Sequence, residues 1–137
     1  MKVVIVVLGL VIGFVSPPAL ADHRCAELQE AAAAGETGQL RSLLDEGVEV
    51  DCRDPEFGGT ALMEAAFWAQ PEAASVLLRY GAAVNARDYD GGTALDYVDM
   101  GWFAYAFMDG EDPGVEARLE EVEELLVQAG GLLGEEF

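Results

Sequence analysis

The 137-residue chain has few of the side chains that most enzymes use for catalysis. It contains one histidine and two cysteines, and no lysine follows Lys2. A serine–histidine–aspartate set is excluded, because the only imidazole, that of His23, stands alone. A phosphate-binding glycine loop is excluded as well, because such a loop needs a lysine after its glycines. We therefore expect no enzymatic activity and no cofactor.

No apolar run in the sequence is long enough to cross a bilayer. Residues 3–15 are apolar, but thirteen residues are too few for a hydrocarbon core of about 30 Å. Lys2 precedes this run, Ser16-Pro17-Pro18 ends it, and Ala19-Leu20-Ala21 has the small residues of a cleavage site. We interpret residues 1–21 as a secretory signal peptide, which predicts a periplasmic or secreted protein with no membrane attachment after cleavage. The alternative is an uncleaved anchor or a buried helix.

Basic residues are scarce, so the charge is strongly one-sided. After residue 21, six arginines stand against 26 aspartates and glutamates, a net charge of −20. Such a chain repels nucleic acid and anionic membrane surfaces. The acidity either steers a basic partner protein or keeps the chain soluble in salty surroundings. Its spread over the whole sequence slightly favours solubility.

What the sequence does contain is a helix–turn–helix pattern, clearest over residues 54–86. Gly58-Gly59 predicts a tight turn, and Thr60 stands where a helix N-cap belongs. Pro71 opens a second helix and Gly81 ends it. The residues expected to face the core are Leu62, Ala65 and Ala66 in the first helix and Ala74, Val76, Leu77 and Leu78 in the second.

The pattern recurs with a period of 33 to 34 residues, the length of an ankyrin repeat. A forward shift of 33 places Thr60-Ala61-Leu62 on Thr93-Ala94-Leu95. A backward shift of 34 places Leu62, Ala65, Ala66, Leu77, Leu78, Gly81 and Val84 on Leu28, Ala31, Ala32, Leu43, Leu44, Gly47 and Val50. The sequence therefore resembles the ankyrin-repeat family over about residues 25–131.

The resemblance implies an all-α solenoid of three helix–turn–helix units. The repeat domain would span residues 22–131, with units at about 25–53, 54–87 and 88–131 and a loose C-terminal tail at 132–137. The family's Thr-Pro-Leu-His turn appears here as Thr60-Ala61-Leu62-Met63 and Thr93-Ala94-Leu95-Asp96. Without the histidine, each turn is expected to lose a polar contact of about 1 kcal/mol, although Asp96 can form a capping box with Thr93.

The third unit departs from the period. Its leucine pair comes at Leu125-Leu126, about fifteen residues later than the period predicts. We expect an aromatic-rich insertion within residues 99–114, followed by a last helix that Asp112 caps and Pro113 starts. The aromatic residues of the insertion are Trp102, Phe103, Tyr105 and Phe107.

The resemblance also brings the two cysteines together, because neighbouring ankyrin units stack their loops side by side. Cys25 opens the first unit and Cys52 precedes the second, so we favour a disulfide between them in an oxidising compartment. Closing a loop of 27 residues would stabilise the fold by roughly 3 kcal/mol. The alternative is a pair of free, buried cysteines.

Ankyrin proteins dock partners on their loop tips and on the concave side of each first helix, and this implies a set of partner-binding residues. Phe67 and Trp68 stand out, because adjacent residues on a helix point about 100° apart. We expect Phe67 to be free and Trp68 to be covered; the alternative is that both pack under the insertion as core. The full set is Arg53, Glu56, Phe57, Phe67, Trp68, Arg87, Tyr89, Asp90, Met100 and Trp102.

We accordingly predict a monomeric, non-enzymatic module that binds another exported protein, a basic one if the acidity serves recognition, and protects or inhibits it. The alternative is an immunity-type inhibitor of a basic toxin or enzyme. No metal site is expected. Asp88-Tyr89-Asp90 begins like a calcium loop, but Gly92 and Thr93 replace the acidic residue and the glycine that must follow. Asp109, Glu111 and Asp112 are expected to form a solvated turn.

Overall fold

The computed structural model describes residues 23–107 and 112–136, and within these ranges it contains helices and no strand. The predicted signal peptide and the acidic residues Asp109 and Glu111 lie outside the described residues. None of the described helices is long and apolar enough to cross a membrane.

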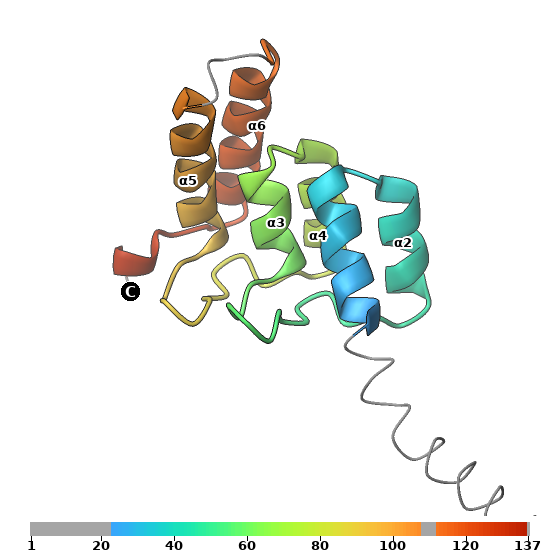
Figure 1. Ribbon diagram of the computed structural model, residues 1–137. Coiled ribbons are helices and arrows are strands. Elements are labelled where there is room, and N and C mark those ends of the chain that lie inside the picture. Colours follow the sequence, from blue (N-terminus) through green and yellow to red (C-terminus); the bar gives the residue numbers. More distant parts are fainter. Residues whose placement is uncertain (1–22, 108–111, 137) are drawn as a thin grey trace, which may run out of the picture.

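Three pairs of antiparallel helices stack side by side (Figure 1). The first helices of the pairs form one row, the second helices form a row behind them, and the loops between pairs gather along one edge. The first pair is the helical segment 23–34 with α2 (Thr37–Asp45), the second is α3 (Ala61–Phe67) with α4 (Pro71–Arg79), and the third is α5 (Ala94–Phe107) with α6 (Val115–Gln128), followed by the short 3-10 helix η1 (Gly134–Glu136).

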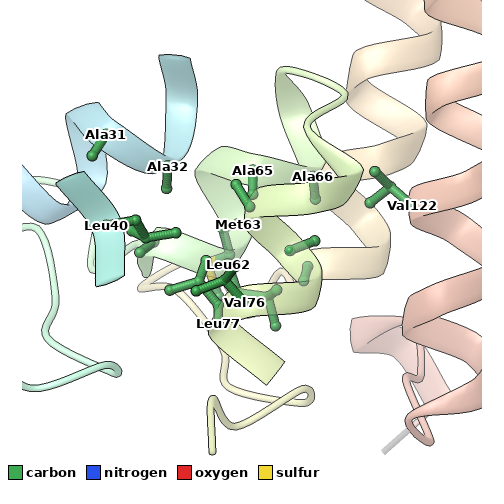
Figure 2. Close-up of a cluster of buried hydrophobic side chains, with 14 of the residues drawn as sticks. Ala31, Ala32, Leu40, Leu62, Met63, Ala65, Ala66, Val76, Leu77 and Val122 are labelled. Atoms are coloured by element: carbon green, nitrogen blue, oxygen red, sulfur yellow. The ribbon is translucent and has the colours of Figure 1, made fainter. Parts of the chain in front are cut away.

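One hydrophobic core runs through all three pairs (Figure 2). The predicted stripe of Leu62, Ala65 and Ala66 is buried, and the equivalent Ala31 and Ala32 of the first helix are buried as well. Alanine at these positions allows the first helices of neighbouring pairs to approach closely. The largest fully buried aliphatic side chains are Leu28, Leu40, Leu62, Met63, Leu77, Val98, Leu119, Val122 and Leu126.

The turn before α3 keeps its polar contacts without a histidine. Thr60 Oγ1 accepts from the backbone N–H of Met63 at 3.4 Å, and the Met63 sulfur accepts from the Thr60 N–H at 3.4 Å. The expectation that this turn loses a polar contact was therefore wrong, because the Met63 thioether can accept a hydrogen bond, although a weak one. At the third unit, Asp96 Oδ2 accepts from the Thr93 N–H at 2.8 Å. The prediction that Asp96 supplies the contact in place of the histidine is confirmed.

A disulfide joins Cys25 to Cys52, whose Cα atoms lie 5.9 Å apart. It links the first helix to the loop that leads into the second unit, so the predicted pairing is confirmed in the structure. The alternative of two free cysteines is wrong.

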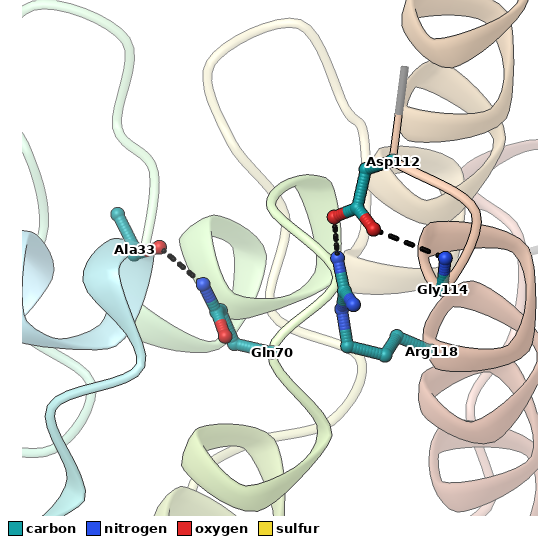
Figure 3. A network of polar contacts seen from close by, with 5 residues as sticks. All are labelled: Ala33, Gln70, Asp112, Gly114 and Arg118. Carbon is teal, nitrogen blue, oxygen red and sulfur yellow. Dashed lines mark hydrogen bonds and ion pairs between the residues drawn. The ribbon is translucent and has the colours of Figure 1, made fainter. Parts of the chain in front are cut away.

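The excess residues of the third unit lengthen its helices rather than forming a separate insertion. α5 has 14 residues against seven in α3, and α6 has 14 against nine in α4. Both helices therefore extend beyond the α3–α4 pair (Figure 1). The predicted cap also needs correction: Gly114 is the N-cap of α6, while Asp112 accepts from the Gly114 N–H at 3.0 Å and pairs with Arg118 (Figure 3).

The C-terminal tail was predicted to be loose, but hydrogen bonds attach it to the rest of the chain. The Leu132 N–H donates to Asn85 Oδ1 at 2.7 Å, and this bond repeats the one from the Ala83 N–H to Asp51 Oδ1 at 2.9 Å. Thr93 Oγ1 also donates to the Leu132 carbonyl at 2.6 Å. The tail thus continues the ladder of bonds between loops where a fourth unit would begin.

Replacing Asn85 tests this attachment. Asn85→Ala removes the acceptor for the Leu132 N–H and the donor to the Gly130 carbonyl, 2.9 Å away. We expect hydrogen exchange at residues 130–136 to accelerate and the free energy of unfolding to fall by about 1 kcal/mol. The control is Gln128→Ala, which removes an amide that donates to the exposed Glu124 at 2.9 Å. This variant should leave the tail unchanged. Unaltered exchange in the tail of Asn85→Ala would contradict this account.

Candidate functional site

Two predicted binding residues, Phe57 and Tyr89, stand at adjacent loop tips. Their side chains are 57% and 66% exposed. The Tyr89 N–H donates to the Phe57 carbonyl at 2.9 Å, which fixes one loop against the other. A Cβ atom on Gly58 would lie 2.6 Å from the Tyr89 ring, so the ring packs on bare backbone. The structure thus brings these two aromatic residues together on a braced surface.

An acidic residue stands next to the aromatic residue at each tip. Glu56 precedes Phe57, Asp90 follows Tyr89, and both carboxylates are exposed. The two turns are built alike, because Asp54 Oδ1 accepts from the Glu56 N–H at 2.7 Å and Asp88 Oδ1 accepts from the Asp90 N–H at 3.0 Å. We call Glu56, Phe57, Tyr89 and Asp90 the tip surface.

The predicted arginines, both exposed, hydrogen-bond to the backbone of the same loops. Arg53 donates to the Gly58 carbonyl at 3.0 Å and to the carbonyl of Arg87. Arg87 in turn donates to the carbonyl of Gly134. Each guanidinium therefore ties its own loop to the one that follows. A contact between either arginine and a partner stays a prediction.

Phe67 and Trp68 lie at the end of α3, with ring centroids 5.1 Å apart in an edge-on arrangement. Trp68 is 51% exposed and Phe67 is half-buried, so the expectation of a free Phe67 and a covered Trp68 was wrong. The chain turns sharply here: Ala69 has φ of 55°, where the first unit has Gly35 at 73°. This left-handed residue ends α3 and turns the chain toward α4.

The two rings line a cavity of about 340 Å³ between α3, α5 and the start of α6. Its other walls come from Gly101, Ala104, Tyr105, Asp112 and Val115. Gly101 is required at this point, because a Cβ atom there would lie 2.8 Å from the Phe67 carbonyl oxygen. The aromatic pair therefore packs near the lengthened α5, which agrees in part with the alternative that both rings belong to the core. Trp68, however, remains half exposed.

Met100 and Trp102 do not share one surface. Trp102 is half-buried against the core, whereas Met100 is exposed on the opposite side of α5, beside Phe103 and Phe107. Those two phenylalanines are missing from the predicted set. The available signal was the spacing of Met100, Phe103, Ala104 and Phe107 at i, i+3, i+4 and i+7, which is visible only if the aromatic stretch is taken as helix.

Two of the described titratable groups near these surfaces, Glu64 and Tyr97, have raised pKa values. Burial raises the pKa of Glu64, a hydrogen bond from Trp68 opposes this, and the charge of Asp54 raises it further. Burial also raises the pKa of Tyr97, whose hydroxyl donates to Asp88 Oδ2 at 2.7 Å. Among the described residues, no three histidine, cysteine or acidic side chains are placed to hold a metal ion.

The raised pKa of Glu64 predicts a pH-dependent effect on stability. A carboxyl group whose folded-state pKa is raised stabilises the fold at low pH, and this stabilisation is lost as pH rises through that pKa. Glu64→Gln keeps an acceptor for Trp68 and removes the charge, so we expect a higher Tm at pH 7 and no gain near pH 3. The control is the exposed Glu116→Gln, which removes the same charge from the surface. Equal gains at pH 7 would contradict the prediction.

Comparison with known proteins agrees with the repeat pattern. A family model for ankyrin repeats in three copies matches residues 28–98. The match ends within α5, where the lengthened helices of the third unit depart from the period. No curated protein sequence matches the chain. Because the match covers just over half of the chain and the helical pairs stack as the repeats require, the chain belongs to the ankyrin-repeat family.

Proposed function

We propose that this protein is an exported, monomeric module that binds another exported protein through its tip surface and protects or inhibits it. Ankyrin repeats bind other proteins, and domains of this family are typically non-enzymatic. The observation that carries the proposal is the pair of exposed aromatic residues, Phe57 and Tyr89, on loops locked together by a backbone hydrogen bond.

The tip surface suits recognition for three physical reasons. Aromatic side chains such as Phe57 and Tyr89 supply most of the energy at protein interfaces. The hydrogen bonds of Asp54, Asp88 and Arg53 hold the loops in place before a partner arrives, so little ordering entropy is lost on binding. The carboxylates of the tips, together with the net charge of −20 over residues 22–137, would steer a basic partner and accelerate its association.

Two features support an exported location. Residues 1–21 have the charged start, apolar run and small-residue cleavage site of a signal peptide. The disulfide between Cys25 and Cys52 is of a kind that persists mainly in oxidising compartments. Both point to the periplasm or the exterior of the cell.

The second candidate is an immunity-type inhibitor that neutralises a basic toxin or enzyme. It is favoured by the pairing of a carboxylate with an aromatic ring at each tip, Glu56 with Phe57 and Asp90 with Tyr89. In that case the carboxylates would imitate an anionic ligand of the target, and the affinity would collapse in high salt.

A capture experiment tests the proposal. Mature protein, residues 22–137, is used as bait in the exported fraction, next to the double variant Phe57→Ala/Tyr89→Ala and the control Val127→Ala, which removes an exposed apolar side chain from α6. We expect the bait and the control to retain the same basic protein. The double variant should retain at least about tenfold less of it. Equal retention by all three baits would reject the tip surface. Retention that vanishes in 0.5 M NaCl would favour the immunity-type inhibitor.

A further inference from the structure

Helix α5 has apolar residues on two opposite sides. Ala94, Val98 and Gly101 are buried on the side that faces the core. On the other side, Met100, Phe103 and Phe107 are 43%, 67% and 72% exposed. A helix that is apolar all round is normally enclosed by protein, yet α5 is the end of its row of first helices (Figure 1). On its outer side the C-terminal tail reaches the first turn, where the Gly134 N–H donates to Asp96 at 2.8 Å.

The exposed stripe is continuous with the cavity at the end of α3. Met100, Phe103, Ala104 and Phe107 are spaced at i, i+3, i+4 and i+7 and so lie on one helical face. Ala104 lines the cavity of about 340 Å³, as Trp68 does. The rings of Phe103 and Phe107 touch, with centroids 4.6 Å apart. We call Trp68, Met100, Phe103, Ala104 and Phe107 the α5 shelf.

The shape of the shelf fits a helix as its occupant. From Met100 to Phe107 the stripe rises about 10 Å along α5, or two helical turns, at about 1.5 Å per residue. An amphipathic helix laid alongside would present its own i, i+3, i+4 and i+7 side chains to such a stripe. The cavity beside Trp68 would accept one large apolar side chain of that helix.

The rim of the shelf is acidic. The exposed Asp99 precedes Phe103 by one helical turn, and Asp112 lines the cavity. Glu116, next to the cavity residue Val115, is exposed. Among the described residues that line the cavity there is no cation, and the nearby Arg118 is paired with Asp112 (Figure 3).

This charge selects among possible occupants. A second copy of residues 22–137 would bring another net charge of −20 against the same rim, and an anionic lipid surface would be repelled. A helix with basic residues beside its apolar face matches both the stripe and the rim.

We propose that the α5 shelf binds an amphipathic helix of a partner protein whose apolar face is flanked by lysine or arginine. The proposal rests on the proposed function only in that the chain acts as a binding module; the shelf and the tip surface are separate.

A designed peptide tests the proposal without knowledge of the natural partner. The probe is a fluorescent 18-residue helix with leucines on one face and lysines on the other, compared with a scrambled peptide of the same composition. Binding to mature protein is followed by fluorescence anisotropy in 0.15 M NaCl. We expect the double variant Phe103→Ala/Phe107→Ala to weaken binding at least tenfold and Phe57→Ala/Tyr89→Ala to leave it unchanged. The scrambled peptide should bind at least tenfold more weakly than the probe.

Several outcomes would overturn the proposal. Equal binding by the shelf variant and the parent would mean that the probe senses only the overall negative charge. Loss of binding in the tip variant alone would move the site to the loops. Self-association in 0.5 M NaCl that disappears in the shelf variant would assign the shelf to a second copy. Adsorption to phosphatidylcholine vesicles that depends on Phe103 and Phe107 would assign it to lipid.

Two further measurements keep the result interpretable. Circular dichroism should show the helicity of the parent in the shelf variant, because both rings point away from the core. Phe103→Arg adds a cation to the shelf and should weaken binding of the basic probe at least as strongly as the double alanine variant does. Capture of a partner through the tip surface and peptide binding to the shelf are scored separately, so either proposal can fail alone.

Discussion

The close approach of neighbouring first helices is the constraint on which the rest of the structure depends. Alanines stand where these helices meet, Ala31 and Ala32 in the first unit and Ala65 and Ala66 in the second, and all are buried. At the third unit Gly101 allows α5 to reach the Phe67 carbonyl oxygen. No single pair can bury its apolar face alone, so each unit is stable only through its neighbours. The spacing that results also sets the loops side by side, which makes the disulfide and the braced tips possible.

The third unit uses the same stacking for a different purpose. Its lengthened helices extend past the second unit, and the outer side of α5 has no helical pair beside it; the C-terminal tail reaches only its first turn, where the Gly134 N–H donates to Asp96. A terminal unit usually presents a polar face to solvent, and α6 does so with its exposed glutamates. α5 instead presents Phe103 and Phe107. An uncovered apolar stripe is a liability for solubility, and the surrounding carboxylates offset it. The tip surface and the α5 shelf are therefore products of two different parts of the repeat, its loops and its end.

Much of the fold could be predicted because the repeat period fixes it. The Thr60 cap, the Pro71 start, the Gly81 stop and the three helical pairs follow from local residues whose effects are short-ranged. The site was harder to predict. A count of excess residues shows that the third unit is longer but not which helix they join. What Phe67 and Trp68 meet depends on α5, whose Gly101 lies against the Phe67 carbonyl oxygen, and this contact has no local signature. The tail was missed because Asn85 holds Leu132 across 47 residues.

The most direct test of this account replaces one of the contact alanines. Ala65→Leu places a larger side chain between the first helices, and overpacking of this kind should lower the free energy of unfolding by about 1–3 kcal/mol. The matched control is Ala117→Leu on the exposed face of α6, which should change it by less than about 0.5 kcal/mol. Urea unfolding followed by circular dichroism measures both. Loss of stability in Ala65→Leu alone is the predicted result, and equal stability of the two variants would contradict the claim that close helix approach holds the units together.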